Sequence, residues 1–119
     1  MKCFACVRES PDIYGLDNGW GNGYVLVPRT HKLFGMHTYD VEKFIDLDIH
    51  GGITWAEGEL PGEVDDFEFI TEKPKDLKDY WVLGFDTAHF GDDSSLDEAL
   101  VIRKTLRLKK YLELDKFSR

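Results

Sequence analysis

Apolar residues follow a strand-like pattern over most of the chain and a helix-like pattern at its end. Short apolar runs at residues 2–9, 24–28, 67–71 and 80–85 are each bounded by turn-forming residues, which is typical of strands. The run at 80–85 is the most apolar, so we expect it in the interior of a sheet. Gly84 within it predicts either a bulge or a close approach by another backbone or a ligand.

Residues 43–50 alternate between apolar and polar positions from Ile45 onwards. Ile45, Leu47 and Ile49 fall on one face, whereas Asp46, Asp48 and His50 fall on the other. This pattern predicts a strand, which would turn at Gly51-Gly52 and return over residues 53–57 as a hairpin. The loops predicted on either side are residues 10–23, rich in Gly and Asn, and the irregular stretch 29–39.

The last part of the chain predicts one long helix from about residue 95 to residue 114. Ser95 and Glu98 have the spacing of a capping box, with Asp97 in the first turn. An apolar stripe is expected along Leu96, Leu100, Leu106 and Leu112, with a basic flank beside it. Several strands followed by one helix predict an α+β fold: a single small domain over residues 1–119, mainly an antiparallel sheet with one long C-terminal helix.

Charge and composition narrow the possible partners. The net charge of −8 argues against DNA or RNA binding, which requires a basic surface. No apolar run is long enough for a membrane span, and the first residues do not have the pattern of a secretion signal. We therefore expect a soluble, cytoplasmic protein with no membrane partner.

Two cysteines, Cys3 and Cys6, lie three residues apart in the first predicted strand. Residues at this spacing point to opposite faces of a strand, so their sulfur atoms would not meet. We interpret them as buried, reduced thiols, with a redox motif or half of a metal site as the alternative.

Polar residues capable of chemistry gather after two of the predicted strands. Asp86, Thr87, His89 and Asp92 follow the run at 80–85, and Asp48, His50 and Thr54 lie around the predicted hairpin turn. Function is often placed at the ends of strands, where a rigid scaffold holds the side chains. We expect the two groups to meet and form one polar site.

Three interpretations of this site stay open from the residues alone. Imidazole and carboxylate groups are metal ligands, so His50, His89, Asp86 and Asp92 could form a metal-dependent hydrolase. Alternatively, Asp86, Thr87 and His89 could form only a hydrogen-bonded turn in a structural or interaction protein. The third interpretation is a ligand site, in which Trp20 offers an aromatic surface and Arg29 and Lys32 offer positive charge.

Three motifs support the third interpretation through a resemblance: Gly23-Tyr-Val-Leu-Val-Pro28, His50-Gly-Gly-Ile-Thr54 and Trp81-x-x-Gly-Phe-Asp86-x-x-His89-x-x-Asp92. Over residues 22–93 the chain resembles a family of small phage and prophage proteins. The resemblance implies an anti-defence protein that sequesters a nucleotide immune signal as a homo-oligomer, without turnover, cofactor, metal or catalytic residue. Under it, Trp20 would stack on a base, and Asp48 or Asp86 would accept from its exocyclic amine. Arg29 and Lys32 would hold phosphate, Thr54 or Thr87 would complete the lining, and His50, His89 and Asp92 would shape the site.

Overall fold

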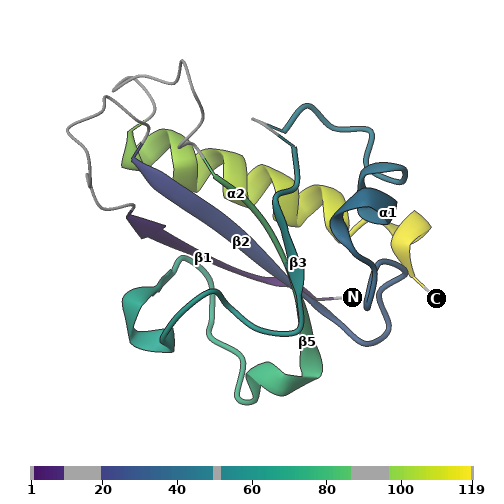
Figure 1. The fold of residues 1–119 in the computed structure, drawn as a ribbon, viewed down its shortest axis with the longest axis horizontal. Coiled ribbons are helices and arrows are strands. Elements are labelled where there is room, and N and C mark those ends of the chain that lie inside the picture. Colours follow the sequence, from purple (N-terminus) through teal and green to yellow (C-terminus); the bar gives the residue numbers. More distant parts are fainter. Residues whose placement is uncertain (1, 10–19, 50–51, 87–96, 119) are drawn as a thin grey trace.

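A computed structural model describes residues 2–9, 20–49, 52–86 and 97–118, and shows an antiparallel sheet with one main helix (Figure 1). The strands lie in the order β3-β5-β2-β1-β4. Their bounds are β1 Phe4–Glu9, β2 Gly21–Pro28, β3 Trp55–Glu57, β4 Glu68–Phe69 and β5 Tyr80–Asp86. The helices are α1 Thr38–Glu42 and α2 Glu98–Leu112, with single 3₁₀ turns at Val64–Asp66, Leu77–Asp79 and Asp115–Phe117. The predicted α+β fold is confirmed.

The two longest strands, β2 and β5, lie side by side in the interior of the sheet. They pair antiparallel along their whole length, from Asn22 opposite Asp86 to Pro28 opposite Tyr80. Both are apolar on both faces, which suits strands covered from both sides. The interior position expected for residues 80–85 is therefore confirmed. In contrast, β2 begins at Gly21, inside the region that the glycines and asparagines predicted as loop.

Gly23 and Gly84 each leave room for a large side chain of the opposite strand. A Cβ atom at Gly84 would lie 2.4 Å from Cδ1 of Tyr24, its partner in the register. One position along, on the other face, a Cβ atom at Gly23 would lie 2.8 Å from the ring of its partner Phe85 and 2.0 Å from Oγ1 of Thr105. Gly84 thus makes room for the side chain of Tyr24, whereas the sequence predicted a bulge or the approach of another backbone or a ligand.

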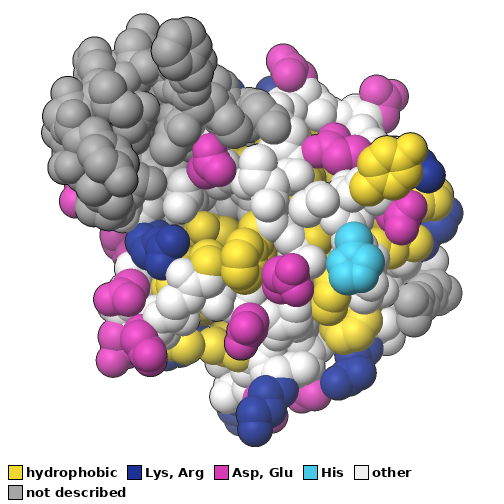
Figure 2. Space-filling model, in the orientation of Figure 1, with side chains coloured by type: hydrophobic (Ala, Val, Ile, Leu, Met, Phe, Trp, Pro, Cys, Tyr) yellow, Lys and Arg dark blue, Asp and Glu magenta, His cyan; other side chains and the backbone are white. Residues whose placement is uncertain are grey.

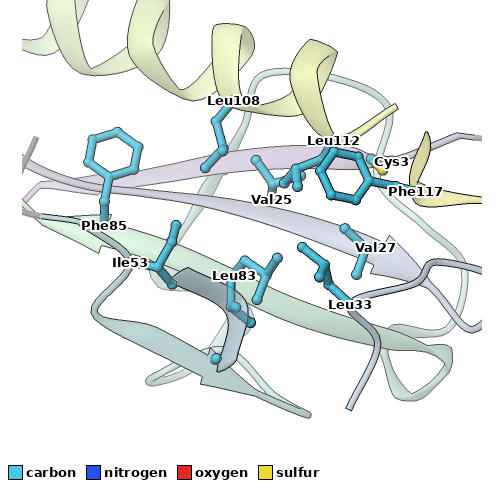
Figure 3. Close-up of a cluster of buried hydrophobic side chains, with 12 residues drawn as sticks. Cys3, Val25, Val27, Leu33, Ile53, Leu83, Phe85, Leu108, Leu112 and Phe117 are labelled. Atoms are coloured by element: carbon cyan, nitrogen blue, oxygen red, sulfur yellow. The ribbon is translucent and has the colours of Figure 1, made fainter. Parts of the chain in front are cut away.

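Helix α2 covers one face of the sheet, over the cluster shown in Figure 3. The buried residues of α2 are Val101, Thr105, Leu108 and Leu112, whose spacing places them on one side of a helix. The predicted stripe is confirmed at Leu112 and wrong at Leu106, which is 39% exposed, while Leu100 is half-buried. The cap at the start of α2 is Asp97, which accepts a hydrogen bond from Leu100 N at 3.0 Å. Ser95 and Leu96 lie outside the described residues.

Residues 57–79 cover the other face without a long helix. Their apolar side chains join a second cluster with alternate residues of the strands, Leu60 and Phe67 packing with Phe4, Cys6, Tyr24, Leu26 and Val82. Cys6 belongs to this cluster and Cys3 to the one under α2, so the two thiols lie on opposite faces, as predicted. Both are reduced and fully buried.

The predicted strand at 43–50 is wrong. Residues 45–49 belong to no strand, although their side chains alternate in burial as predicted. Ile45, Leu47 and Ile49 pack against the core, while Asp46 and Asp48 are exposed. The backbone instead bonds to a side chain, since Asp46 N donates to the Tyr111 hydroxyl at 2.7 Å. The first strand of the predicted hairpin is therefore absent. Helix α1 ends at Glu42, just before this segment.

A buried histidine joins the end of β2 to the end of α2. The ring of His31 is fully buried and stacks on Phe117 with 5.2 Å between ring centroids. Its Nδ1 accepts from Leu33 N at 3.0 Å, so Nε2 carries the hydrogen that it donates to Leu112 O at 2.8 Å. Among the described residues, no helix is sufficiently long and apolar to cross a membrane.

Candidate ligand-binding site

The sheet edge where β5 ends brings together two of the predicted site residues. Thr54 lies beside β5, because its backbone N donates to Gly84 O at 2.8 Å. Its hydroxyl donates to Oδ2 of Asp86 at 3.3 Å. One residue of each predicted polar group, Thr54 and Asp86, is therefore in contact with the other.

A small recess opens between the 47–49 segment and α2, on the face of the sheet that α2 covers. Asp86 belongs to the other face, because it lies two residues after Gly84, which packs against Tyr24 there. Its lining consists of Leu47, Asp48, Ile49, Phe85, Lys104, Arg107 and Leu108. The enclosed volume is about 10 Å³, which is room for about one water molecule. Phe85 is only 1% exposed, so it forms part of an apolar floor and offers no face for stacking. The recess can thus receive one small group of a ligand whose remainder lies on the surface.

Three charged side chains surround the recess. Lys104 is half-buried, whereas Arg107 and Asp48 are exposed. None of the three forms an ion pair within the described parts of the chain. By contrast, Lys109 on the opposite flank of α2 has its Nζ 3.0 Å from Oε1 of Glu113.

This arrangement favours an anion between Lys104 and Arg107. The two cations are three residues apart on one helix, so they are neighbours and repel each other when no anion lies between them. Arg and Lys are the usual partners of phosphate and carboxylate groups. Asp48 at the same recess can accept a hydrogen bond from a donor on the same ligand.

Trp20 lies at the same end of the sheet. It is half-buried and directly precedes β2, whose Asn22 pairs with Asp86 across the sheet. Asp48, Thr54, Asp86 and Trp20 are thus all placed around this end. The other residues predicted for this group, His50, Thr87, His89 and Asp92, lie outside the described residues.

Arg29 and Lys32 lie elsewhere. Arg29 follows Pro28, which pairs with the first residue of β5, so the length of β5 separates it from Asp86 by about 20 Å. Its Nε is 3.7 Å from Oδ1 of Asp79 and its guanidinium is 5.2 Å from the centre of the Phe34 ring. Nζ of Lys32 is 5.0 Å from the centre of the Phe44 ring. Within one chain, these two cations do not join the site around Asp86.

The sequence interpretation missed Lys104 and Arg107, which it treated as part of a basic flank. A signal was present, because neither residue has an acidic residue three or four positions away on the helix. Lys109 has one in Glu113. A cation on a helix without such a neighbour cannot form the usual intrahelical ion pair, which leaves its charge for another partner.

The positions of the described residues also bear on the predicted metal site. Within residues 2–9, 20–49, 52–86 and 97–118, no three His, Cys, Asp or Glu side chains gather closely enough to hold a metal ion. The metal-dependent hydrolase predicted as an alternative relies on His50, His89 and Asp92, which are outside these ranges. Asp86, its remaining member, lies beside Thr54 instead.

Comparison with models of protein families, with curated proteins and with solved structures finds no match.

Proposed function

We propose that this protein binds a small anionic ligand of the nucleotide class at the recess between residues 47–49 and α2 and does not turn it over. The observation that carries the proposal is the pair Lys104 and Arg107, which lack an ion-pair partner in the described chain and flank a recess also lined by Asp48. A phosphate would lie between the two cations. Asp48 would accept from an amine on the base, and Trp20 at the same end would provide an aromatic surface.

The composition of the recess supports binding rather than catalysis. Its lining consists of four apolar side chains, two cations and one carboxylate. Its one carboxylate, Asp48, has no Ser, Thr, Cys or His beside it in the lining that it could activate as a nucleophile. The resemblance to phage and prophage proteins supports the more specific role, sequestration of a nucleotide immune signal inside a bacterial host.

Thermal unfolding with a nucleotide panel tests this proposal. The panel includes mononucleotides and linear and cyclic dinucleotides, each at a concentration well above micromolar. A ligand at a hundredfold its Kd should stabilise the folded state by about 2.7 kcal/mol. Ligand recovered after heat denaturation should have its original mass.

The matched variants are Lys104→Ala/Arg107→Ala and Arg29→Ala/Lys32→Ala. Both remove two positive charges, but only the first removes them from the recess. The first variant should lose the ligand-induced increase in Tm, and the second should keep it. The proposal is wrong if the second variant loses binding and the first retains it, or if no panel member changes the Tm.

The form of the recovered ligand distinguishes the remaining functions. Cleaved ligand whose formation stops on addition of a chelator would support the metal-dependent hydrolase. A folded protein whose Tm responds to neither metals nor nucleotides would support the structural or interaction protein.

A further inference from the structure

The two sides of the sheet carry opposite charge. Helix α2 contains one acidic and five basic residues, whereas residues 57–79 contain nine acidic and three basic residues, in a chain of net charge −8. These segments pack on opposite faces of the sheet (Figure 1). Figure 2 shows Asp and Glu side chains gathered over the lower left of the view, where the chain continues after β3. The molecule thus has a basic side and an acidic side.

The basic side has an exposed apolar residue at its centre. Arg103, Leu106 and Lys110 lie on the side of α2 opposite its buried residues. All three are exposed, Leu106 by 39%. Neither Arg103 nor Lys110 forms an ion pair within the part of the chain that the structure describes. We call these three residues the basic face.

The acidic side has a groove. It has a volume of about 280 Å³ and is lined by Gly58, Glu59, Leu60, Gly62, Val64, Leu77 and Lys78. Glu63, Asp65 and Asp66 are exposed beside it and form no ion pair with other described residues. Leu60, Val64 and Leu77 give the groove apolar walls. We call the groove and these three acids the acidic face.

We infer that the basic face of one copy docks on the acidic face of a second copy. Arg103 and Lys110 match the acids in sign, and the apolar walls of the groove suit Leu106. This apolar contact favours a second copy over a nucleic acid, whose phosphates would leave Leu106 exposed. Because the two surfaces differ, the contact is heterologous, and repeated contacts would build a ring or an open chain.

The basic face excludes Lys104 and Arg107, the cations of the proposed ligand site. A substitution can therefore abolish self-association without affecting ligand binding, or the reverse, so the two proposals are tested separately. Ligand binding is measured at a protein concentration low enough to keep the protein monomeric.

Sedimentation velocity with two charge-reversal variants tests this inference. The basic-face variant is Arg103→Glu/Lys110→Glu, and the acidic-face variant is Glu63→Lys/Asp65→Lys. Wild type should form species larger than a dimer as its concentration rises to about 100 µM. Each variant alone should stay monomeric.

The mixture of the two variants gives the decisive result. The acidic-face variant keeps an intact basic face, and the basic-face variant keeps an intact acidic face. Their 1:1 mixture should therefore assemble although neither variant does so alone, because the two intact faces match in sign and the two reversed faces also match each other. The control variant Lys32→Glu/Lys43→Glu has the same change in charge as the basic-face variant, at positions outside both faces, and should assemble like wild type. Circular dichroism verifies that each variant is folded.

Three outcomes would overturn the inference. Wild type could remain monomeric at all concentrations, or the mixed variants could remain monomeric while wild type assembles. The third outcome is that single-stranded DNA binds wild type but not the basic-face variant, without self-association, which would assign this surface to a nucleic acid.

Discussion

The ring of Tyr24 lies against Gly84 of the neighbouring strand, where a Cβ atom would approach Tyr24 Cδ1 to 2.4 Å. Phe85 and Gly23 form the reciprocal pair on the other face of the same two strands. Each aromatic ring thus covers a glycine on the opposite strand. The close packing of β2 and β5 depends on the absence of side chains at these two positions.

Replacing Gly84 with alanine should destabilise the protein by about 1–3 kcal/mol. The added methyl group overpacks the site, and the ring of Tyr24 must leave its position to make room. Urea denaturation followed by circular dichroism measures the change. Gly58→Ala is the control, since a Cβ atom there would lie 3.7 Å from Trp81, an ordinary contact, and should change stability by less than about 0.5 kcal/mol. Equal effects of the two substitutions would contradict the packing argument.

Replacing His31 with alanine should cost about 3 kcal/mol of stability. The substitution leaves the buried Leu33 N–H and Leu112 C=O without their partner and opens a cavity beside Phe117. Denaturant unfolding again provides the measurement. His37→Ala is the matched control because His37 is exposed, and it should change stability by less than about 0.5 kcal/mol. If His31→Ala unfolds at the same denaturant concentration as wild type, these hydrogen bonds do not stabilise the end of α2.

The two thiols should be unreactive in the folded protein. Burial raises the pKa of both Cys3 and Cys6 from an ordinary value of 9.0 to about 12, so almost no thiolate, the reactive form, is present at neutral pH. Ellman's reagent should therefore label no cysteine in native protein at pH 8 and two per chain in denaturant. Rapid native labelling of either cysteine would contradict the buried positions.

The same shift predicts a loss of stability in alkaline solution. The unfolded chain releases its thiol protons near pH 9, whereas the folded chain keeps them to about pH 12. The unfolded state thus binds fewer protons in this window, and the free energy of unfolding falls by up to about 1.4 kcal/mol per thiol for each pH unit. Unfolding should be measured from pH 7 to 10.5 for wild type and Cys3→Ala/Cys6→Ala. The variant should show a shallower decline above pH 9, and parallel curves would refute the assignment.

Removing the cap of α2 should have a moderate effect. Asp97→Ala removes the acceptor of the bond from Leu100 N and should cost about 1 kcal/mol. Asp97→Asn keeps an acceptor and should retain most of that stability. Thermal unfolding of the pair measures the difference, and an equal loss for both would indicate that charge at the helix N-terminus, rather than the hydrogen bond, is responsible.

The strands at the centre of the sheet could be predicted because their local pattern and their tertiary setting agree. Residues 80–85 are apolar on both faces and lie between two other strands. At residues 45–49 the alternation correctly predicts which side chains face the core, but not the presence of a strand. Alternation reports the direction of side chains, whereas a strand also requires a neighbouring backbone, and here Asp46 N bonds to the Tyr111 hydroxyl.

The buried side of α2 was less predictable because leucine alone does not define it. Val101 and Thr105 are fully buried, while Leu106 is exposed. Thr105 can be buried because its hydroxyl donates to Val101 O at 2.7 Å within the same helix. At the candidate site, Thr54 and Asp86 were placed together by the sequence. The sequence did not indicate that Lys104 lies near Asp48, because this proximity depends on how α2 packs across the sheet.

The position of β2 also affects how the chain folds as it is synthesised. β2 is buried on both faces and is completed at Pro28, but its partner β5 begins only at Tyr80 and its cover α2 only at Glu98. A nascent chain that contains β1 and β2 must therefore expose this apolar strand until most of the protein has left the ribosome. Such long-range pairing slows folding and exposes surfaces that aggregate. Production of soluble protein should for this reason benefit from slower synthesis or added chaperones.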